Sequence, residues 1–256
     1  MKEQTLKGKV ALITGGGQGI GQGIALAMAE RGANVVVVGR TYSKCENTCK
    51  MIEQRFSGKA IPKAADVAMH NDLKRITQET VEEFKTIDIL VNNAVATSIG
   101  PLISQNDENV IQAFMVGPMA TLRLMQLCYP YLKQQGGSII NMASTASKRW
   151  DMSNYGVYAA EKDAIRALTR AAASEWGPDN IRANNILPHA SSPALQKWMK
   201  HRPEEAAEFT KSIPLQRVGD CETDIGQFVA VLCSPESSYI RTLKHIRRRR
   251  RTPPRR

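Results

Sequence analysis

Lys9-Val-Ala-Leu-Ile-Thr-Gly-Gly-Gly-Gln-Gly-Ile-Gly21 is the stretch that decides the fold of this 256-residue chain. It begins with an apolar run that is long enough for a buried parallel strand. Gly15, Gly19 and Gly21 follow, and apolar residues then recur at helical spacing from Ile20 to Arg31. Glycines let the backbone approach a ligand closely, and a helix N-terminus offers free N–H groups and partial positive charge to a pyrophosphate. A strand, a glycine turn and a helix in this order therefore predict a dinucleotide-binding site.

The end of the second predicted strand, residues 34–38, bears on the choice of cofactor. Gly39-Arg40 follows this strand, and no acidic residue stands at its end. An acidic residue at this place binds a free ribose 2′-hydroxyl, whereas an arginine accommodates a 2′-phosphate. Lys44 lies just beyond. We therefore predict NADP as the cofactor, with NAD as the alternative if Arg40 is only a solvated loop residue.

The rest of the chain alternates short apolar runs with helical patterns. Further strands are predicted at residues 60–64, 87–91, 138–142 and 181–187, and helices at 42–56, 70–85, 104–134 and 155–176. Regular β–α alternation predicts an α/β fold, a Rossmann-type doubly wound parallel sheet in three α/β/α layers, as a single domain over residues 1–240. Sites in such sheets lie beyond the carboxyl ends of the strands. Gly15, Asn92, Ser144 and Pro188 all fall at such ends.

A second motif, Tyr158-Ala-Ala-Glu-Lys162, lies in the helix predicted at 155–176. A free tyrosine titrates near ~10, which is too high for efficient acid–base catalysis at neutral pH. Residues four apart share a helix face, so the Lys162 ammonium can favour the phenolate and lower the pKa of Tyr158. Ser144, at the end of the preceding strand, can donate a hydrogen bond to a carbonyl oxygen. We predict Ser144, Tyr158 and Lys162 as the catalytic residues.

In the order and spacing of its motifs, the chain resembles the short-chain dehydrogenase/reductase family over about residues 6–240. The motifs that carry the resemblance are Thr14–Gly21, Asp66-Val67, Asn92-Asn-Ala94, Ser144, Tyr158 with Lys162, Trp176 to Arg182, and Pro188. The resemblance implies that Asp66 and Val67 contact the adenine, and that Asn92 to Ala94 support the sheet and the ribose. The predicted cofactor-binding residues are Gly15, Gln18, Gly19, Ile20, Gly21, Arg40, Asp66, Val67, Asn92, Ala94, Tyr158, Lys162 and Pro188.

The resemblance also implies an oxidoreductase that transfers a hydride between NADP(H) and a ketone or secondary alcohol. Tyr158 would be the acid/base, Lys162 would lower its pKa and hold the ribose, and Ser144 would orient the carbonyl. Thr145 is the alternative to Ser144, because its separation from Tyr158 fits the commoner family spacing. The family further implies a homodimer or homotetramer and a mobile flap over the substrate at residues 188–214. Candidates for an apolar pocket lining are Trp150, Met152 and Tyr155.

Three residues near the predicted site depart from the usual family pattern. Val95 replaces a glycine, Met115 replaces an asparagine that holds a water in the proton relay, and His189 replaces a glycine. Methionine cannot make the hydrogen bonds of an amide, and valine is costly wherever a positive φ is required. A catalytically impaired dinucleotide-binding protein is therefore the alternative function.

The basic charge of the chain is concentrated at its C-terminus. Of the 35 lysines and arginines, nine lie in residues 241–256, so the rest of the chain carries 26 basic against 24 acidic side chains. Five successive arginines cannot be buried, and we expect a disordered tail where the family has its last strand. Non-specific nucleic-acid binding by this tail is the third and lowest-ranked function.

Composition also indicates where the protein works. The five cysteines are odd in number and form no Cys-x-x-Cys, which is typical of reduced thiols in a cytoplasmic protein. No apolar stretch approaches the ~20 residues of a membrane span, so we expect no membrane association. The four histidines are scattered, and we predict no metal site.

Overall fold

The computed structural model describes residues 3–148 and 153–240, so the Arg-rich tail and the predicted pocket residues Trp150 and Met152 lie outside the described residues. Within them a six-stranded sheet has the order β3-β2-β1-β4-β5-β6, and all five neighbouring pairs are parallel. The order reverses between β1 and β4, which confirms the doubly wound arrangement. The strands are β1 (Val10–Thr14), β2 (Asn34–Gly39), β3 (Ala60–Ala64), β4 (Ile89–Asn92), β5 (Gly137–Met142) and β6 (Ile181–Ile186).

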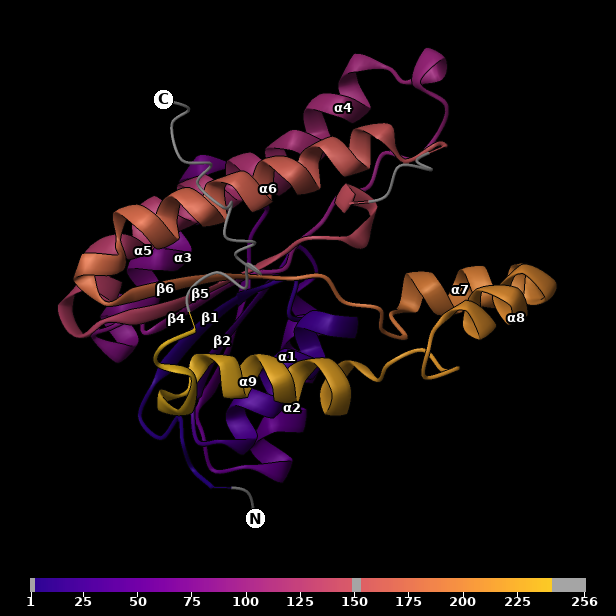
Figure 1. The fold of residues 1–256 in the computed structure, drawn as a ribbon. Coiled ribbons are helices and arrows are strands. Elements are labelled where there is room, and N and C mark those ends of the chain that lie inside the picture. Colours follow the sequence, from indigo (N-terminus) through magenta and orange to yellow (C-terminus); the bar gives the residue numbers. More distant parts are fainter. Residues whose placement is uncertain (1–2, 149–152, 241–256) are drawn as a thin grey trace, which may run out of the picture.

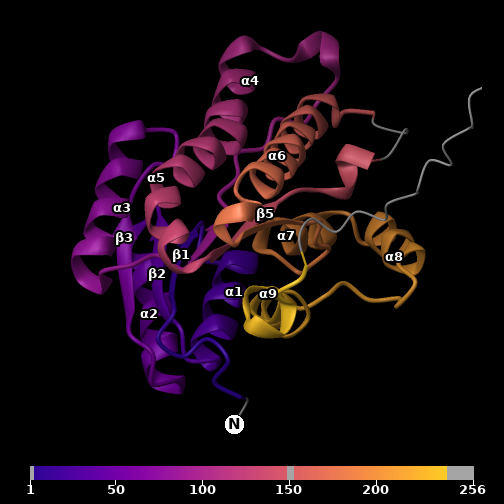
Figure 2. The same cartoon turned by 60° about the vertical axis from the view of Figure 1, so that its left-hand side comes forward.

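Helices cover both faces of this sheet, as the three-layer prediction requires. In the described residues they are α1 (Gly19–Glu30), α2 (Tyr42–Arg55), α3 (His70–Phe84), α4 (Asp107–Phe114), α5 (Ala120–Gln135), α6 (Gly156–Glu175), α7 (Pro193–His201), α8 (Pro203–Ser212) and α9 (Gln227–Cys233). Figure 1 shows α1, α2 and α9 on one side of the sheet and α3, α5 and α6 on the other. The turned view of Figure 2 shows the same separation, with α4 beside α6.

The central strands are apolar on both faces, without the alternation of apolar and polar residues that a half-exposed strand shows. Along β2, Val35 and Val37 belong to the core cluster under α1, whereas Val36 and Val38 belong to the cluster under α3 and α5. Successive side chains of a strand point to opposite faces. Both faces are covered here, so a parallel strand must be apolar throughout.

The helix predicted at 104–134 begins at Asp107 and is interrupted in its middle. Asn106 caps its start by accepting a hydrogen bond from the Asn109 N–H at 2.8 Å. Between α4 and α5 lies a π-helical turn, η2 (Met115–Met119), which contains Pro118. Proline has no backbone N–H and its ring clashes with the preceding turn, which favours a departure from regular α-helical hydrogen bonding here. By length and composition alone, Asp107–Gln135 could cross a membrane, but α5 packs buried residues into the core as the helix of a globular domain does.

After β6 the chain leaves the sheet and forms the α7–α8 segment (residues 193–212), which extends away from the body in Figure 1. The chain on either side of this segment comes together where Ala190 forms a parallel bridge with Gly219. The chain then passes through a second π-helical turn, η5 (Cys221–Gly226), and into α9, both of which pack against α1.

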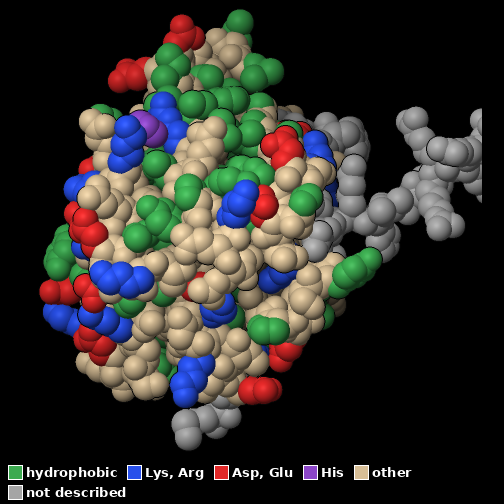
Figure 3. All heavy atoms as spheres, turned by 90° about the vertical axis from the view of Figure 1, so that its left-hand side faces the viewer, with side chains coloured by type: hydrophobic (Ala, Val, Ile, Leu, Met, Phe, Trp, Pro, Cys, Tyr) green, Lys and Arg blue, Asp and Glu red, His purple; other side chains and the backbone are tan. Residues whose placement is uncertain are grey.

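The charged side chains of the body are distributed over its surface. On the face shown in Figure 3, lysine and arginine side chains are interspersed with aspartate and glutamate. This distribution agrees with the near balance of charge outside residues 241–256, and this face shows no large patch of one sign.

Candidate active site

The glycine turn between β1 and α1 is held in place by the neighbouring end of β4. Gly15 has a φ of +65°, and a Cβ there would lie 2.7 Å from the side-chain nitrogen of Asn93. That nitrogen donates to the carbonyl oxygens of Thr14 and Gly15 at 3.0 and 3.1 Å. The Thr14 hydroxyl in turn accepts from the N–H groups of Asn93 and Ala94. The turn therefore requires glycine for its conformation and for the close approach of β4.

The start of α1 offers an anion site. Its N-cap residue, Gln18, makes no side-chain capping bond, and the first turn holds no acidic residue. The first N–H groups of a helix have no partner within the helix, and the helix dipole favours negative charge there. A pyrophosphate would supply the missing acceptors. Gly19, with a φ of +57°, forms the bend immediately before this site.

Two cations lie beside the glycine turn. Arg40 is exposed directly after β2, and Lys44 lies in the first turn of α2. The Lys44 Nζ donates a hydrogen bond to Gln18 Oε1 at 2.8 Å, which ties α2 to the start of α1. Guanidinium and ammonium groups are the side chains that bind phosphate, so the positions of Arg40 and Lys44 bear on the choice between NAD and NADP.

Other predicted cofactor residues have structural partners of their own. Asp66 accepts a hydrogen bond from the Ala68 N–H at 3.0 Å, and Val67 is buried in the core. Asn92 is also buried, and its side chain donates to Asn141 Oδ1 at 2.8 Å. Asn92 therefore joins the ends of β4 and β5, while Asn93, which was not among the predicted cofactor residues, holds the glycine turn.

Ser144, Tyr158 and Lys162 meet beyond the carboxyl end of β5. The Ser144 hydroxyl lies close enough to the Tyr158 phenol to act on the pKa of that phenol. Lys162 is 3% exposed, and its Nζ donates to the carbonyl oxygen of Met142 at 3.2 Å. This nitrogen lies 5.5 Å from the centre of the Tyr158 ring. A hydroxyl, a phenol and an ammonium are thus gathered at one place, as proton transfer to a carbonyl oxygen requires.

The pKa values of these groups are governed first by burial. Burial raises the pKa of the Tyr158 phenol, and the Ser144 hydroxyl acts in the opposite direction. Burial also lowers the pKa of the Lys162 ammonium, against the opposing effect of the neighbouring Glu161 carboxylate. The sequence motif predicts a lowered pKa for Tyr158, and the structure differs. Desolvation disfavours the phenolate, and the Lys162 ammonium is itself paired with the Glu161 carboxylate.

Thr145 has a different partner from Ser144. Its hydroxyl lies 3.0 Å from Nε2 of His189, the residue after Pro188. The His189 ring packs against Phe209 of α8 with centroids 5.8 Å apart, and Phe209 packs edge-on against Trp198 of α7. Thr145 and His189 thus connect the loop after β5 to the α7–α8 segment, while Ser144 faces Tyr158.

The departures Val95 and Met115 differ in their surroundings. Val95 is 49% exposed and does not have a positive φ, so it carries no left-handed backbone strain. Met115 opens the π-helical turn η2 and packs against the core cluster under α3 and α5. Neither side chain takes part in the hydrogen bond or ring contact described for Lys162.

Glu161 is a residue of this site that was not predicted from the sequence. It is fully buried, and its Oε1 lies 3.3 Å from the Lys162 Nζ. Burial raises the pKa of its carboxyl to about 7, against the lowering effect of Lys162. The available signal was its position three residues after Tyr158, which places both on one helix face.

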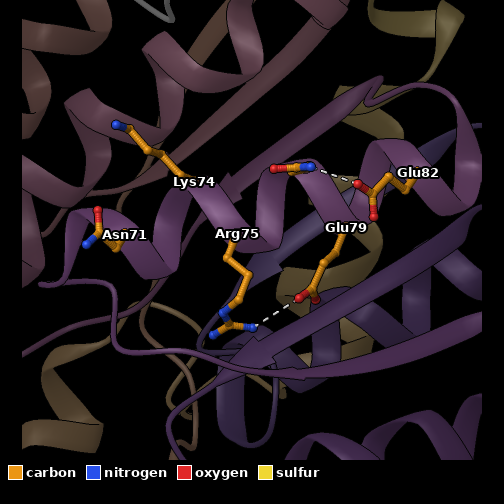
Figure 4. Close-up of a pocket in the computed structure, with 6 residues that line it drawn as sticks. Asn71, Lys74, Arg75, Glu79 and Glu82 are labelled. Atoms are coloured by element: carbon orange, nitrogen blue, oxygen red, sulfur yellow. Dashed lines mark hydrogen bonds and ion pairs between the residues drawn. The ribbon is translucent and has the colours of Figure 1, made fainter.

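A charged hollow on α3 lies outside the predicted site. The hollow, shown in Figure 4, is lined by Asn71, Lys74, Arg75, Gln78, Glu79 and Glu82. Arg75 is paired with Glu79, the Glu82 carboxylate accepts a hydrogen bond from Gln78, and none of the lining residues belongs to the predicted site. Within the described residues, no group of three or more histidine, cysteine or acidic side chains is arranged to hold a metal ion.

Comparisons with known proteins agree with this geometry. The sequence profile of a family described as enoyl-(acyl carrier protein) reductase matches residues 15–245. A 12α-hydroxysteroid dehydrogenase from a Clostridium species is 40% identical over 240 residues, which cover 91% of this chain and 92% of that protein.

Solved structures give the same result. A 7α-hydroxysteroid dehydrogenase complexed with NADH and 7-oxo glycochenodeoxycholic acid superimposes with a TM-score of 0.86 at 29% identity, covering 95% of this chain and 96% of the other. A short-chain dehydrogenase from Burkholderia cenocepacia J2315 in complex with NADP has a TM-score of 0.84 at 28% identity, with coverages of 93% and 96%. The chain therefore belongs to the short-chain dehydrogenase/reductase family, whose members are oxidoreductases acting on hydroxyl and carbonyl groups.

Proposed function

We propose that this enzyme interconverts a ketone and a secondary alcohol on a large apolar substrate of the steroid class, with NADP(H) as its cofactor. The observation that carries the proposal is the meeting of Ser144, Tyr158 and Lys162 at the sheet edge that also holds the glycine turn. A bound nicotinamide supplies or accepts the hydride.

The protein side chains handle the proton. In the reduction, the Ser144 hydroxyl donates a hydrogen bond to the carbonyl oxygen, and the Tyr158 phenol transfers its proton to the same oxygen. The Lys162 ammonium stabilises the phenolate that remains. In the oxidation, the phenolate accepts the proton of the alcohol. The raised pKa of Tyr158 supports the acid form at neutral pH.

The proposed steroid class rests on two kinds of support. The relatives include a 12α-hydroxysteroid dehydrogenase and a 7α-hydroxysteroid dehydrogenase, and both cover more than 90% of this chain. In the chain itself, Trp198 and Phe209 form an aromatic cluster with His189, next to Thr145 in the loop after β5. Aromatic surface of this kind suits an apolar ligand better than a sugar.

The choice of NADP rests on Arg40 and Lys44, and titration with NADPH and NADH tests it. We expect NADPH to bind at least about tenfold more tightly, because a charge-assisted hydrogen bond contributes about 1.5–3 kcal/mol. Arg40→Ala should remove most of this preference and leave NADH binding unchanged. Arg170→Ala, at an exposed arginine on α6, is the control. Equal affinities in the unaltered enzyme would refute the NADP proposal.

Turnover of a panel of ketosteroids and hydroxysteroids tests the reaction. Tyr158→Phe should lower kcat about 10²–10⁴-fold, the contribution of a positioned acid or base, and should change cofactor affinity far less than kcat. Ser144→Ala should cost about 10²–10³-fold, as loss of an oxyanion donor does, and Thr145→Val less than about tenfold. A larger loss in Thr145→Val would assign the catalytic hydroxyl to Thr145. Cofactor binding without turnover on any carbonyl substrate would favour the impaired dinucleotide-binding alternative.

We also propose a cytoplasmic homodimer or homotetramer. The support is a set of exposed apolar side chains beside α4 and α6, among which Ile103 is 97% and Ile111 is 60% exposed. The five cysteines are free thiols in the structure, which agrees with a reducing compartment. Light scattering of the purified enzyme would measure the assembly, and a monomer would contradict it.

A further inference from the structure

The carboxyl of Glu161 is the buried acidic group closest to the proposed chemistry. Both Glu161 and Lys162 are removed from solvent, and the carboxylate oxygen Oε1 lies 3.3 Å from the Lys162 Nζ. Among the described residues, neither oxygen of this carboxylate has a partner in full hydrogen-bond geometry. A buried charge without hydrogen bonds is costly, so the ion pair with Lys162 is the principal compensation for burying Glu161.

The elements packed around Glu161 supply no second cation among the described residues. Gly117 of η2 lies against the Glu161 carboxyl group, since a Cβ added to Gly117 would be 3.6 Å from the carboxyl carbon. Residues 115–119 of η2 include no ionisable side chain. From β5 comes the Met142 carbonyl oxygen, which accepts a hydrogen bond from Lys162. Among the described residues of neighbouring turns, Lys148 is exposed, and Arg166 bonds to Asp163 and Ser147. The first turn of α4 adds only the exposed acids Asp107 and Glu108.

Lys162 is therefore shared between two acidic groups on α6. Tyr158 and Glu161 precede it by four and by one residue, and its Nζ lies 5.5 Å from the Tyr158 ring centre. An ammonium favours the ionised form of each neighbour, but a carboxylate beside it cancels much of its field at the phenol. We propose that Glu161 is a positioning residue that competes with Tyr158 for the Lys162 ammonium, so that an ionised Glu161 keeps Tyr158 in its proton-donating form. This inference rests on the proposed function of Tyr158 as the acid/base.

The direction of the effect follows from the charges. Burial raises the pKa of the Glu161 carboxyl to about 7, so its charge changes within the neutral range. Above that pH the carboxylate is paired with Lys162 and raises the pKa of Tyr158. Below it Glu161 is neutral, and the field of Lys162 acts on Tyr158 alone. The result is an enzyme whose phenol remains protonated, and ready to reduce a carbonyl, to a higher pH than Lys162 alone would permit.

Glu161→Gln tests the proposal, because glutamine has the same shape without the charge. The phenolate of Tyr158 is titrated by its ultraviolet absorbance, as the difference between each protein and the same protein carrying Tyr158→Phe. We expect the pKa of Tyr158 to fall by about 1 in Glu161→Gln, the smaller end of the effect of one neighbouring charge. Glu161→Asp, which keeps the carboxylate, should restore most of the difference. Asp163→Asn removes an exposed carboxylate from the same helix and should have no effect.

The kinetic counterpart is the pH profile of alcohol oxidation. In Glu161→Gln the rising limb of kcat/KM should move by about 1 toward lower pH, because the base form of Tyr158 appears earlier. An unchanged or raised pKa of Tyr158 in Glu161→Gln would overturn the proposal. If that variant does not fold, Glu161→Ser provides the same comparison with a smaller neutral side chain. The absorbance titration needs no substrate, so it decides the role of Glu161 even if the enzyme turns over no ketone or alcohol.

Discussion

Helix α1 and the α7–α8 segment both border the candidate active site, but they are held by different amounts of packing. Eight of the 12 residues of α1 are buried, whereas α7 has no buried residue and α8 has only Ala206. The cofactor end of the site is therefore part of the core. The flanking α7–α8 segment is a surface excursion.

The contacts that hold the two regions differ in kind. In α1, Gly23 meets the backbone of Cys221 in η5, and Gly226 of η5 meets the Gly23 carbonyl in return. The α7–α8 segment is held by the Ser192 cap and by the ring contacts of Trp198, Phe209 and His189. Backbone-to-backbone packing leaves a helix no room to shift. A segment held by a few ring contacts can change its position at lower cost. The glycine turn and α1 are therefore expected to be pre-organised, and the α7–α8 segment to be adaptable.

The largest expected effect comes from crowding the rigid region. In Gly23→Val, a Cβ would lie 2.2 Å from the carbonyl oxygen of Cys221, so backbone must move. We expect the free energy of unfolding to fall by about 3 kcal/mol, at the upper end for overpacking, together with loss of cofactor binding. Denaturant unfolding measures it. Gly117→Ala is the control, because the nearest atom would be 3.6 Å away. Wild-type stability in Gly23→Val would show that the contact between α1 and η5 is not rigid.

The buried acid of α6 gives the next largest effect, on the pH dependence of stability. The pKa of Glu161 rises from 4.5 to about 7 on folding, so between these values the folded state binds more protons than the unfolded state. The free energy of unfolding therefore falls as pH rises through this window and levels off above it. In the unaltered protein this decrease in the free energy of unfolding should be on the order of 2 kcal/mol, and it should be absent in Glu161→Gln. Unfolding of both proteins at about pH 5 and pH 8 measures it. An identical fall in both would assign it to other groups.

The smallest expected effect comes from the α7–α8 segment. Phe209→Ala removes its contacts with Trp198 and His189, and we expect the free energy of unfolding to fall by about 1 kcal/mol. The KM for the carbonyl substrate should rise while the affinity for NADPH stays the same. Leu215→Ala, at a 75% exposed side chain after α8, is the control. Weakened NADPH binding in Phe209→Ala would remove the distinction between the two regions.

The same contrast explains what the sequence could predict. The strands and α1, α2, α3 and α6 are strongly patterned, because each is covered on its buried face, and the predicted doubly wound parallel sheet is confirmed. The interruption at Pro118 was missed, since apolar periodicity continues on both sides of it. The η5 turn and α9 were not predicted either, because their place is set by contact with α1 and not by a strong pattern of their own.

The candidate site shows a similar limit. Motif spacing placed Ser144, Tyr158 and Lys162 together, because strand ends and helix faces are local properties. Burial is not local. Spacing could place Glu161 on the helix face of Tyr158, but it could not reveal that the Glu161 carboxylate is buried against η2, which comes from another part of the chain. The predicted lowering of the Tyr158 pKa was wrong for the same reason, since it counted the field of Lys162 without the desolvation that opposes it.

The bridge at the foot of the α7–α8 segment bears on how such a scaffold can change over evolution. Ser191 donates to the Gly219 carbonyl at 2.8 Å and Gly219 donates to the His189 carbonyl at 3.1 Å, so the segment is a loop closed at its own base. Lengthening a closed surface loop costs little free energy, about 0.6 kcal/mol for each doubling. Residues between positions 191 and 219 can thus be inserted, deleted or replaced while the positions of Ser144, Tyr158 and Lys162 are kept. Exchange of the α7–α8 segment alone would in this way change the substrate range of the enzyme and leave its catalytic residues in place.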